Sequence, residues 1–528
     1  MTLEIRRLLC DSLTLARSAH PQKIVAQVGK ENYTYEQLYQ QSQAIAAYLQ
    51  YRGLQRGDRV AIFMENTWAL LPSLYAVLYA GGVFLVINHL TKTNKLEYIL
   101  RDSGAKFLLT DSIVAKQFLP AAANVECVQE IIYAGAEITE QDMHAHGTNT
   151  HGTKALVRLI NVLDAALHTR KAIRSPAISK DIAALIYTSG STGDPKGVIM
   201  THANMVFTSD SLIEYLRLDA SAKIICFLPL AFDYGLYQIL MTIRLGACLI
   251  VSKSFAFPSV VFAEITDQAA TVFPGVPTVF STLIGLHQKS PQCFPSVTRV
   301  TNTAAALPPE YVPHLKQIFP NALIYKMYGL TECKRVSYLE PEDAERYPNS
   351  VGKAIPGTEV FLLDDKLQPV PPNTMGTLYV RGAHVMQGYW NKPQETKKML
   401  VDNIYPNEQV LCAQDQFVID ENGYLYFHGR VDDIIKSRGE KVSPVEVENV
   451  LYRMPGIREA AVIGVPDLIE GETIKAFVAL DAGLNIDPKK IRQHCIANLE
   501  SFMVPRDVVV LESLPKTDSN KISKKELR

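Results

Sequence analysis

Residues 183–197 read AALIYTSGSTGDPKG, an apolar run that leads directly into a loop rich in glycine and hydroxyl residues. The apolar run has the length and composition of a buried strand. The loop contains three glycines, four serine or threonine residues and one lysine. Glycine lets a backbone approach a ligand closely, and hydroxyl and ammonium groups donate to phosphate oxygens. The stretch therefore predicts a strand followed by a phosphate-binding loop, and a plain surface turn is the alternative.

Apolar runs of the same kind recur on both sides of this loop. Examples are RVAIFM at Arg59–Met64, FLLTD at Phe107–Asp111 and CLIVS at Cys248–Ser252, and helix-length stretches such as Thr34–Arg52 lie elsewhere between such runs. This alternation predicts an α/β fold with largely parallel sheets.

Length, hydrophobic content, net charge and cysteine content limit the kinds of protein that the chain can be. A length of 528 residues predicts two to four domains, and 47% hydrophobic residues exclude a mostly disordered chain. With 53 Lys and Arg against 54 Asp and Glu, the net charge of −1 provides no general attraction to nucleic acid or to an anionic membrane. The 8 cysteines are scattered without a CxxC pair, which indicates reduced thiols and favours a cytoplasmic location.

Two stretches allow a second interpretation, one as a membrane span and one as a metal site. Residues Trp68–Ile87 carry no charge and are long enough to span a bilayer. Because Pro72 and Gly81-Gly82 interrupt the stretch, we expect a buried helix, a turn and a buried strand in a soluble protein. The region Glu137–Lys180 is polar and includes HAHGTNTHGTK. We expect its histidines to belong to a mobile insertion, with a metal site as the less favoured alternative.

The loop at 187–197 resembles the phosphate-binding signature of the adenylate-forming superfamily. That superfamily includes acyl-CoA synthetases, firefly-type luciferases and the adenylation domains of nonribosomal peptide synthetases. Further motifs of the family recur in order along essentially the whole chain: YAGGVFLVIN (79–88), LPLAFDYGLYQ (228–238), TAAALPP (303–309), MYGLTE (327–332), the region 410–447, and LPKTDSNKISKKELR (514–528).

The resemblance implies a two-part organisation. A large N-terminal adenylate-forming domain over residues 1–428 would contain parallel-rich sheets with helices and a β-barrel-like subdomain. A hinge at 429–433, centred on Asp432, would lead to a small mobile α+β domain over 434–528. The implied reaction joins a carboxylate to the α-phosphate of ATP, releases pyrophosphate, and then transfers the acyl group to a thiol.

The resemblance also implies which residues bind ATP and Mg²⁺. The implied ATP site comprises Thr188, Ser189, Gly190, Ser191, Thr192, Gly193, Lys196, Thr303, Ala304, Ala305, Tyr328, Gly329, Asp415 and Arg430. The implied catalytic residues are Lys521, Thr331 and Glu332, and Glu332 would also bind Mg²⁺. By residue type alone, Lys521 would be a solvated surface lysine.

For the second half-reaction the resemblance implies a thiolation face around Lys436 and Gly439. Three positions depart from the family pattern. Gln414 stands in place of the glycine before the ribose aspartate, Asn520 in place of the glycine before the terminal lysine, and Ala305 in place of the glutamate of the adenine turn. These departures leave open a catalytically silent homologue that binds nucleotide.

The segment around Asp233 bears on the substrate. It resembles stand-alone enzymes that load L-proline onto a separate carrier protein, in which an aspartate pairs with the α-ammonium group. By residue type, Asp233 is equally well explained as a helix cap. The implied pocket residues are Asp233, Tyr234, Tyr237, Thr303, Met327 and Val336. We expect a small carboxylic acid as substrate, L-proline first, with a carrier protein in trans as the thiol acceptor; an acyl- or aryl-CoA synthetase that uses coenzyme A is the alternative.

Overall fold

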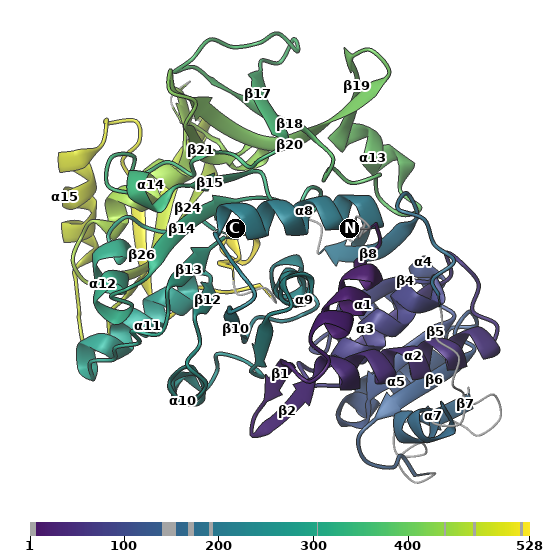
Figure 1. The fold of residues 1–528 in the computed structure, drawn as a ribbon. Coiled ribbons are helices and arrows are strands. Elements are labelled where there is room, and N and C mark those ends of the chain that lie inside the picture. The colour runs from purple at the N-terminus through teal and green to yellow at the C-terminus, as the bar shows by residue number, and fades with distance from the viewer. Residues whose placement is uncertain are drawn as a thin grey trace. The chain divides into compact units, whose positions relative to one another are not determined.

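The computed structural model describes residues 7–139, 155–166, 174–188, 194–303, 305–437, 440–467, 471–517 and 521–528. Figure 1 shows the helices and strands of the chain. The chain forms two compact units. The first unit consists of Met1–Phe273, Thr331–Lys334 and Ala383–Lys397, and the second of Pro274–Leu330, Arg335–Gly382 and Lys398–Arg528. Each unit is described by itself.

A seven-stranded sheet with the strand order β7-β6-β5-β3-β4-β8-β9 forms the centre of the first unit. Its strands are β3 (Arg59–Met64), β4 (Val83–Asn88), β5 (Phe107–Asp111), β6 (Glu130–Ala134), β7 (Ala155–Arg158), β8 (Ile182–Thr188) and β9 (Lys196–Thr201). All neighbouring strands are parallel except β8 and β9, which are antiparallel. The predicted strands at 59–64, 107–111 and 183–189 are therefore confirmed, the last with its ends shifted by one residue.

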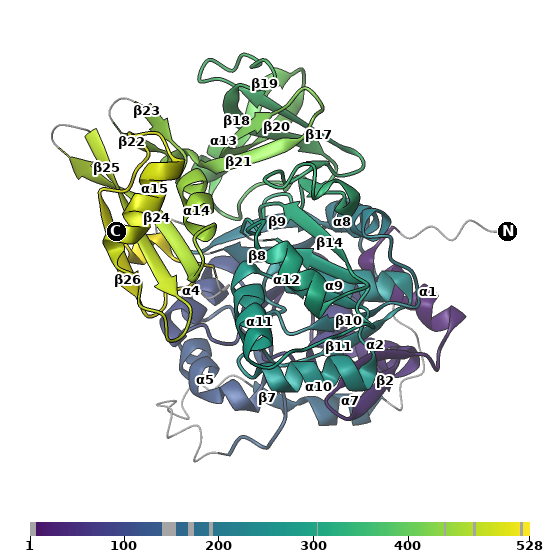
Figure 2. The same cartoon turned by 90° about the vertical axis from the view of Figure 1, so that its left-hand side faces the viewer.

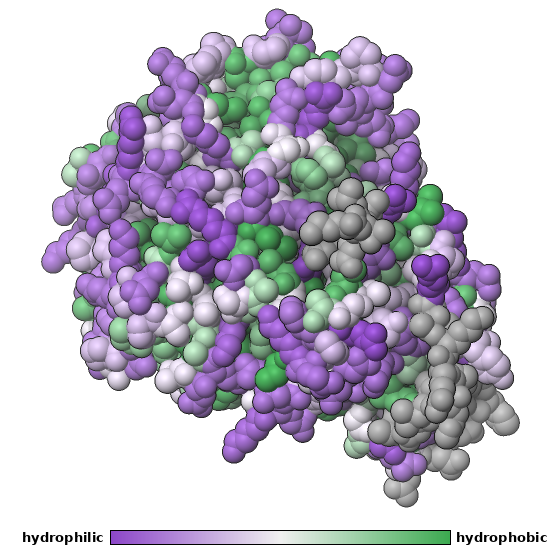
Figure 3. Space-filling model, viewed as in Figure 1, coloured by the Kyte–Doolittle hydropathy of each residue, from purple (hydrophilic) through white to green (hydrophobic). Residues whose placement is uncertain are grey.

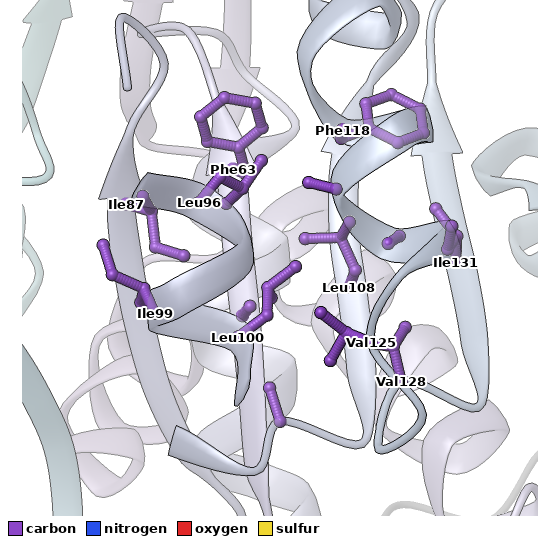
Figure 4. Close-up of a cluster of buried hydrophobic side chains, with 14 of the residues drawn as sticks. Phe63, Ile87, Leu96, Ile99, Leu100, Leu108, Phe118, Val125, Val128 and Ile131 are labelled. Carbon is purple, nitrogen blue, oxygen red and sulfur yellow. The ribbon is translucent and has the colours of Figure 1, made fainter. Parts of the chain in front are cut away.

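Apolar side chains fill one face of this sheet (Figure 4). Phe63, Ile87, Leu108 and Ile131 come from four of the strands, and the helices α4 (Thr93–Ser103) and α5 (Ala115–Ala123) cover them with Leu96, Leu100 and Phe118, among others. All these residues are nearly or fully buried. Burial of this cluster is what joins the parallel strands to their helices.

The uncharged stretch at 68–87 folds as predicted. It forms α3 (Leu70–Ala80), which is buried along its whole length, and most of β4. Gly81 ends the helix in the left-handed conformation at φ 83°, which glycine adopts without a steric penalty. Among the described residues, no helix is both long enough and apolar enough to cross a membrane.

The first unit contains further strands and helices. A second group of strands, β10 (Lys223–Cys226), β11 (Cys248–Val251) and β1 (Ile24–Val28), is parallel, and β2 (Glu31–Thr34) is antiparallel to β1. The helices are α1 (Leu9–Ala19), α2 (Tyr35–Tyr51), α7 (Leu159–Ala166), α8 (His202–Tyr215), α9 (Asp233–Leu245), α10 (Pro258–Gln268) and the 3₁₀ turn Ser112–Val114. The predicted helix at 34–52 is α2, and the polar region 137–180 contributes β7 and α7.

The second unit begins with a mixed sheet. Its strands are β13 (Arg299–Asn302) and β14 (Leu323–Tyr328), which are parallel, followed by the antiparallel β15 (Ser337–Leu339) and β16 (Lys353–Ala354). The strand β12 (Val272–Gly275) and the helices α11 (Pro277–Lys289) and α12 (Tyr311–Ile318) accompany them, with a 3₁₀ turn at Pro341–Asp343.

A five-stranded antiparallel sheet follows in the second unit. It contains β17 (Thr358–Leu363), β18 (Met375–Gly382), β20 (Glu408–Ile419) and β19 (Leu400–Tyr405) in that order, and β21 (Leu425–Arg430) pairs with β20. The short helix α13 (Pro393–Met399) precedes β19.

The C-terminal part forms its own sheet of five strands (Figure 2). These are β22 (Ile435–Ser437), β23 (Glu440–Val442), β24 (Ile457–Asp467), β25 (Gly471–Leu480) and β26 (Asp507–Leu511), with the 3₁₀ turns Val431–Asp433 and Lys524–Glu526 at the two ends. The helices α14 (Pro444–Tyr452) and α15 (Pro488–Asn498) bury Val447, Leu451 and Ile491 against it. A separate cluster with Leu514 and Ile522 packs on β24 and β25.

The predicted fold class is confirmed: an α/β protein with a large N-terminal portion of mixed sheets and helices and a smaller C-terminal domain. The boundaries at 428 and 434 and the mobility of the C-terminal domain stay predictions. All eight cysteines lie among the described residues, and none of them forms a disulfide there. On the face seen in Figure 3 most side chains are hydrophilic, and hydrophobic ones reach the surface in small groups.

Candidate active site

The phosphate loop begins and ends on neighbouring strands of the first unit. Because β8 and β9 pair antiparallel, Thr188 lies directly opposite Lys196 at the two ends of the loop. Both side chains are half-buried. The loop residues Ser189, Gly190, Ser191, Thr192 and Gly193 lie outside the described residues. The predicted strand before the loop is β8, and a second strand, β9, follows the loop.

Tyr389 connects Lys196 with Glu332. The Lys196 Nζ atom lies 5.4 Å from the centroid of the Tyr389 ring, within the range of a cation–π interaction. The Tyr389 hydroxyl donates a hydrogen bond of 2.5 Å to Glu332 Oε1. The Met386 amide donates to the Glu332 carbonyl oxygen at 2.8 Å. Two of the predicted residues, with Thr331 adjacent in the chain, are thus brought together by a tyrosine that the sequence analysis did not single out.

The segment 387–390 explains how Tyr389 reaches this position. Gln387 and Trp390 donate backbone hydrogen bonds to Ile199 and Gly197, and Ile199 donates to Gly388, all at 2.8–3.0 Å. Since β9 is the last strand of the seven-stranded sheet, this segment pairs with its open edge. The pairing joins residues almost 200 positions apart, and no local pattern in the sequence indicates it.

Asp233 forms an ion pair inside the first unit. Its Oδ2 atom lies 3.2 Å from Nζ of Lys334, whose side chain is only 2% exposed. The same ammonium group lies 5.3 Å and 5.0 Å from the ring centroids of Tyr234 and Tyr237. The cation that the sequence analysis assigned to a substrate is therefore supplied by the protein itself.

The helix-cap alternative for Asp233 does not hold in its strict form. The N-cap of α9 is Phe232, and Asp233 is the first residue of the helix. Its carboxylate nevertheless lies in the first turn, where it interacts favourably with the helix dipole. Lys334 was missed because its partner lies about a hundred residues earlier; the one available signal is a basic pair, Lys334-Arg335, directly after MYGLTE.

The other predicted pocket residues belong to the second unit and are buried. Thr303 is 5% exposed, Met327 4% and Val336 0%. Arg335, also buried, donates from Nη1 to the Thr303 hydroxyl. A guanidinium group is thus placed beside the predicted pocket threonine, another contact that the sequence did not reveal.

The predicted ribose and adenine residues form one cluster in the second unit. The Tyr328 hydroxyl donates to Asp415 Oδ2, and Arg430 Nε lies 3.5 Å from Asp415 Oδ1. Asp415 and Arg430 face each other across β20 and β21. The Tyr328 ring packs on Phe417 and Phe427, with centroid distances of 4.8 Å and 5.8 Å. Gly329 follows β14 directly.

Two departures from the family pattern have a local explanation. Gln414 has a φ of 55°, the left-handed conformation that the family's usual glycine would adopt without cost. Ala305 is exposed, and its carbonyl accepts a hydrogen bond of 3.0 Å from Asn302. Ala304 lies outside the described residues.

The C-terminal residues are only partly described. Lys521 is exposed, and its carbonyl and amide bond to the Thr517 amide and hydroxyl at 2.7 Å and 3.2 Å. Asn520 and Gly439 lie outside the described residues, as do the side chains of Asp432 and Lys436, whose backbones belong to the turn at 431–433 and to β22. The catalytic, hinge and thiolation roles of these residues stay predictions.

Sequence comparison assigns the chain to a family. A profile described as AMP-binding enzyme matches residues 15–390, and one described as AMP-binding enzyme C-terminal domain matches residues 446–521. The chain belongs to the AMP-binding enzyme family.

Relatives of this AMP-binding enzyme match it over nearly their whole length. A long-chain-fatty-acid–CoA ligase of Bacillus subtilis is 30% identical, and the match covers 98% of this chain and 93% of that protein. The crystal structure of the anthranilate CoA ligase AuaEII with anthranoyl-AMP is 25% identical with a TM-score of 0.89, covering 100% and 97%. ATP-bound MatB from Rhodopseudomonas palustris is 27% identical with a TM-score of 0.86, covering 99% and 98%.

These matches confirm the predicted superfamily and support the predicted use of ATP. None of these relatives is named as an enzyme specific for proline or for a carrier protein. Among the described residues of this AMP-binding enzyme, no group of three or more His, Cys, Asp or Glu side chains is placed to hold a metal ion. The histidines of the segment HAHGTNTHGTK lie outside the described residues.

Proposed function

We propose that this AMP-binding enzyme is an ATP-dependent CoA ligase for a small carboxylic acid that carries no ammonium group near its carboxylate. It activates the acid as an acyl-adenylate and transfers the acyl group to coenzyme A. Two of the three relatives described above are named as CoA ligases. The observation that carries the choice of substrate class is the ion pair between Asp233 and Lys334.

The argument from this pair is electrostatic. A carboxylate in an apolar wall is costly unless a cation lies beside it. Lys334 fills that role for Asp233, and its own charge lies against two tyrosine rings. The α-ammonium group of an amino acid would meet a carboxylate that is already neutralised and a lysine of like charge. A plain carboxylic acid avoids this repulsion.

The two half-reactions fit the remaining groups. In the first, a carboxylate oxygen attacks the α-phosphorus of ATP and the bond to the β-phosphate oxygen breaks, so that pyrophosphate leaves. Both reactants are anions, and cations placed around the phosphates stabilise the transition state. Lys196 and the loop beside it would hold the β- and γ-phosphates, Asp415 and Arg430 the ribose, and Lys521 the transferring group. In the second, the thiolate of coenzyme A attacks the carbonyl carbon and AMP leaves.

The residues present fit a Mg²⁺ ion. Proteins often bind Mg²⁺ through one or two carboxylates together with phosphate oxygens of the substrate. Glu332 is a single half-buried carboxylate, and its Oε1 is oriented by the Tyr389 hydroxyl. Mg²⁺ would neutralise charge on the phosphate oxygens there.

L-proline loading onto a carrier protein was the first expectation from the sequence. The segment FDYGLYQ suggested it, but the ion pair of Asp233 and the names of the relatives favour the alternative, a CoA ligase. The two functions differ in both the acid and the thiol, so one experiment separates them.

That experiment measures acid-dependent AMP release and pyrophosphate exchange. The acids are L-proline and the other amino acids, benzoate and anthranilate, and saturated fatty acids of increasing length. Each is tested with coenzyme A and with a phosphopantetheinylated carrier protein. We expect turnover with a plain acid and free coenzyme A. Exchange that depends on proline alone overturns the proposal, and nucleotide binding without AMP release in any combination supports a silent homologue.

Lys521 tests the assignment of the two half-reactions. We expect Lys521→Ala to lower the adenylation rate by about a hundredfold or more, because a positioned cation is lost, and to leave thioester formation from preformed acyl-adenylate largely intact. Lys525→Ala, which removes an exposed lysine of the same segment, is the matched control and is expected to change neither rate. If Lys521→Ala slows both steps equally, the role assigned to Lys521 is wrong.

A further inference from the structure

The C-terminal end of α4 contacts two segments of the candidate active site in the first unit. Asp102 is the last residue but one of this helix. Its side-chain Oδ2 atom accepts a hydrogen bond of 2.6 Å from the Tyr187 hydroxyl. Its carbonyl oxygen accepts hydrogen bonds of 3.1 Å from Trp390 Nε1 and from Asn391 Nδ2. A single residue therefore connects α4 with β8 and with the segment 387–391.

The carboxylate of Asp102 is unfavourably placed in its own helix. The last carbonyl groups of a helix carry partial negative charge, which repels an acidic side chain in the last turn. These carbonyls also need hydrogen-bond donors from outside the helix. The Tyr187 hydroxyl offsets the repulsion, and Trp390 and Asn391 supply donors for the Asp102 carbonyl. The contacts of Asp102 outside α4 therefore account for an acidic residue at this position, and the stability of the helix does not.

The two aromatic partners of Asp102 pack on Gly197. Tyr187 lies directly opposite Gly197 across β8 and β9. A Cβ atom at Gly197 would lie 3.1 Å from Cζ of Tyr187 and 3.4 Å from Cβ of Trp390. Burial and, after it, the hydrogen bond to Asp102 raise the pKa of the Tyr187 hydroxyl, so this group keeps the proton that it donates. The contacts of Asp102 thus fix the backbone next to Lys196.

The other partners of Asp102 fix the position of Tyr389. Trp390 and Asn391 directly follow Tyr389 in the chain. The Tyr389 ring lies 5.4 Å from Lys196 Nζ, and its hydroxyl donates to Glu332. A displacement of the end of α4 would therefore move the lysine and the glutamate relative to each other. Small errors in the placement of charged groups reduce their interaction with a substrate.

We propose that Asp102 is a positioning residue for the binding of ATP, because it holds Lys196 and Glu332 in place through Tyr187 and through the segment 387–391. This inference rests on the proposed function, since it takes Lys196 and Glu332 as the groups that hold the β- and γ-phosphates and Mg²⁺. AMP lacks these two phosphates. The effect of Asp102 should therefore fall on ATP and leave AMP unchanged.

The test compares the binding of MgATP and of AMP in calorimetry, which requires no acid substrate. For Asp102→Ala we expect the affinity for MgATP to fall about tenfold, the value of a hydrogen bond to a charged group, and the affinity for AMP to stay within about twofold. Tyr187→Phe keeps the ring and should have the same effect. The double variant should lose no more than either single variant, because both changes remove one hydrogen bond. A fall of both affinities by the same factor indicates a merely structural role and overturns the proposal.

Two further variants serve as rescue and control. Asp102→Asn keeps an oxygen acceptor for the Tyr187 hydroxyl and should recover most of the affinity for MgATP. Asp343→Ala is the matched control, since Asp343 accepts a hydrogen bond of 2.6 Å from the Tyr424 hydroxyl in the second unit. We expect Asp343→Ala to change neither affinity. An equal loss of MgATP affinity in this control would contradict a specific role for Asp102.

The two half-reactions separate this inference from the proposed function. Asp102→Ala should slow adenylation and leave thioester formation from preformed acyl-adenylate unchanged, because the β- and γ-phosphates have then left. If the wild type releases AMP with an acid and Asp102→Ala binds MgATP as the wild type does, the inference alone is overturned. If the wild type binds MgATP no more tightly than AMP and releases no AMP with any acid, the proposed function fails and the inference fails with it.

Discussion

Two buried lysines, Lys334 and Lys326, are held in different ways. Lys334, in the first unit, is 2% exposed and lies against the Asp233 carboxylate and two tyrosine rings. Lys326, in the second unit, is 4% exposed, and its ammonium group donates to the Pro348 carbonyl. Burial lowers the pKa of Lys326 to about 8, partly opposed by the charge of Glu310. One lysine is thus part of a charge pair, and the other is a buried base whose pKa is lowered to about 8.

The difference shows that the partner of a buried lysine decides whether its charge stabilises or destabilises the fold. A buried lysine beside a carboxylate has its charge balanced by its partner, so removing the partner leaves an uncompensated charge in the interior. A buried lysine that donates only to a backbone carbonyl has no opposite charge beside it, so burial lowers its pKa and destabilises its charged form. Removing one member of each arrangement should therefore have opposite effects on stability.

The largest effect is expected for Asp233→Ala. This change leaves the Lys334 ammonium buried without its carboxylate, and breaking such a pair costs about 3 kcal/mol of the free energy of unfolding. Urea denaturation measures the loss. The double variant Asp233→Leu with Lys334→Met should recover most of it, because no charge remains buried. If single and double variants are equally unstable, the pair does not stabilise its surroundings electrostatically.

Lys326→Met should raise stability at pH 7 by about 2 kcal/mol. Because the pKa of the folded state lies near 8 and that of the unfolded state near 10.5, the folded state bears a penalty of about 3 kcal/mol below pH 8. Loss of the hydrogen bond to Pro348 offsets about 1 kcal/mol of the gain. The penalty disappears as the pH rises from 8 to 10.5, so the advantage of the variant should shrink over that range.

The pH dependence is the decisive measurement for Lys326. Free energies of unfolding of the wild type and Lys326→Met are compared between pH 7 and pH 10.5. Lys223→Met is a control at a half-buried lysine that also donates to a backbone carbonyl, that of Gln268 at 2.9 Å. A constant difference between Lys326→Met and the wild type across this range would contradict the lowered pKa.

The smallest effect is expected for Tyr389, whose side chain contacts both Lys196 and Glu332. Tyr389→Phe keeps the ring under Lys196 and removes the hydrogen bond to Glu332. We expect adenylation to fall about tenfold, with a higher Mg²⁺ concentration needed for half-maximal rate, since a hydrogen bond to a charged group is worth about 1.5 kcal/mol. Tyr405→Phe removes a similar contact to Glu359 in the five-stranded sheet and should change neither value. An unchanged Mg²⁺ requirement in Tyr389→Phe would contradict the role of Tyr389.

The sequence predicted those features that depend on neighbouring residues. The strands β3 and β5, the helix α2 and the strand β8 that leads into the phosphate loop follow from local apolar patterns. The cluster of Tyr328, Asp415 and Arg430 followed from a family resemblance, and the structure brings these residues together.

The features that the sequence did not predict join distant residues. Lys334 reaches Asp233, Tyr389 reaches Glu332, and Arg335 reaches Thr303, each through the fold and without a local signal. The expectation of proline as substrate rested on Asp233, and the residue type of Asp233 does not show which group supplies the cation beside it; in the structure Lys334 lies there.

The position of α3 in the chain has a consequence for synthesis of the protein. This helix carries no charged residue and is buried along its whole length in the folded protein. While it is exposed during synthesis, its hydrophobic surface favours aggregation. Its packing partner α2 precedes it in the chain, and β3, against which it also packs, lies between the two. Two of the elements that pack on α3, namely α2 and β3, have therefore been synthesised before the helix emerges. Only β4 must follow to complete the local β-α-β unit. The order of the elements shortens the time during which this segment can aggregate.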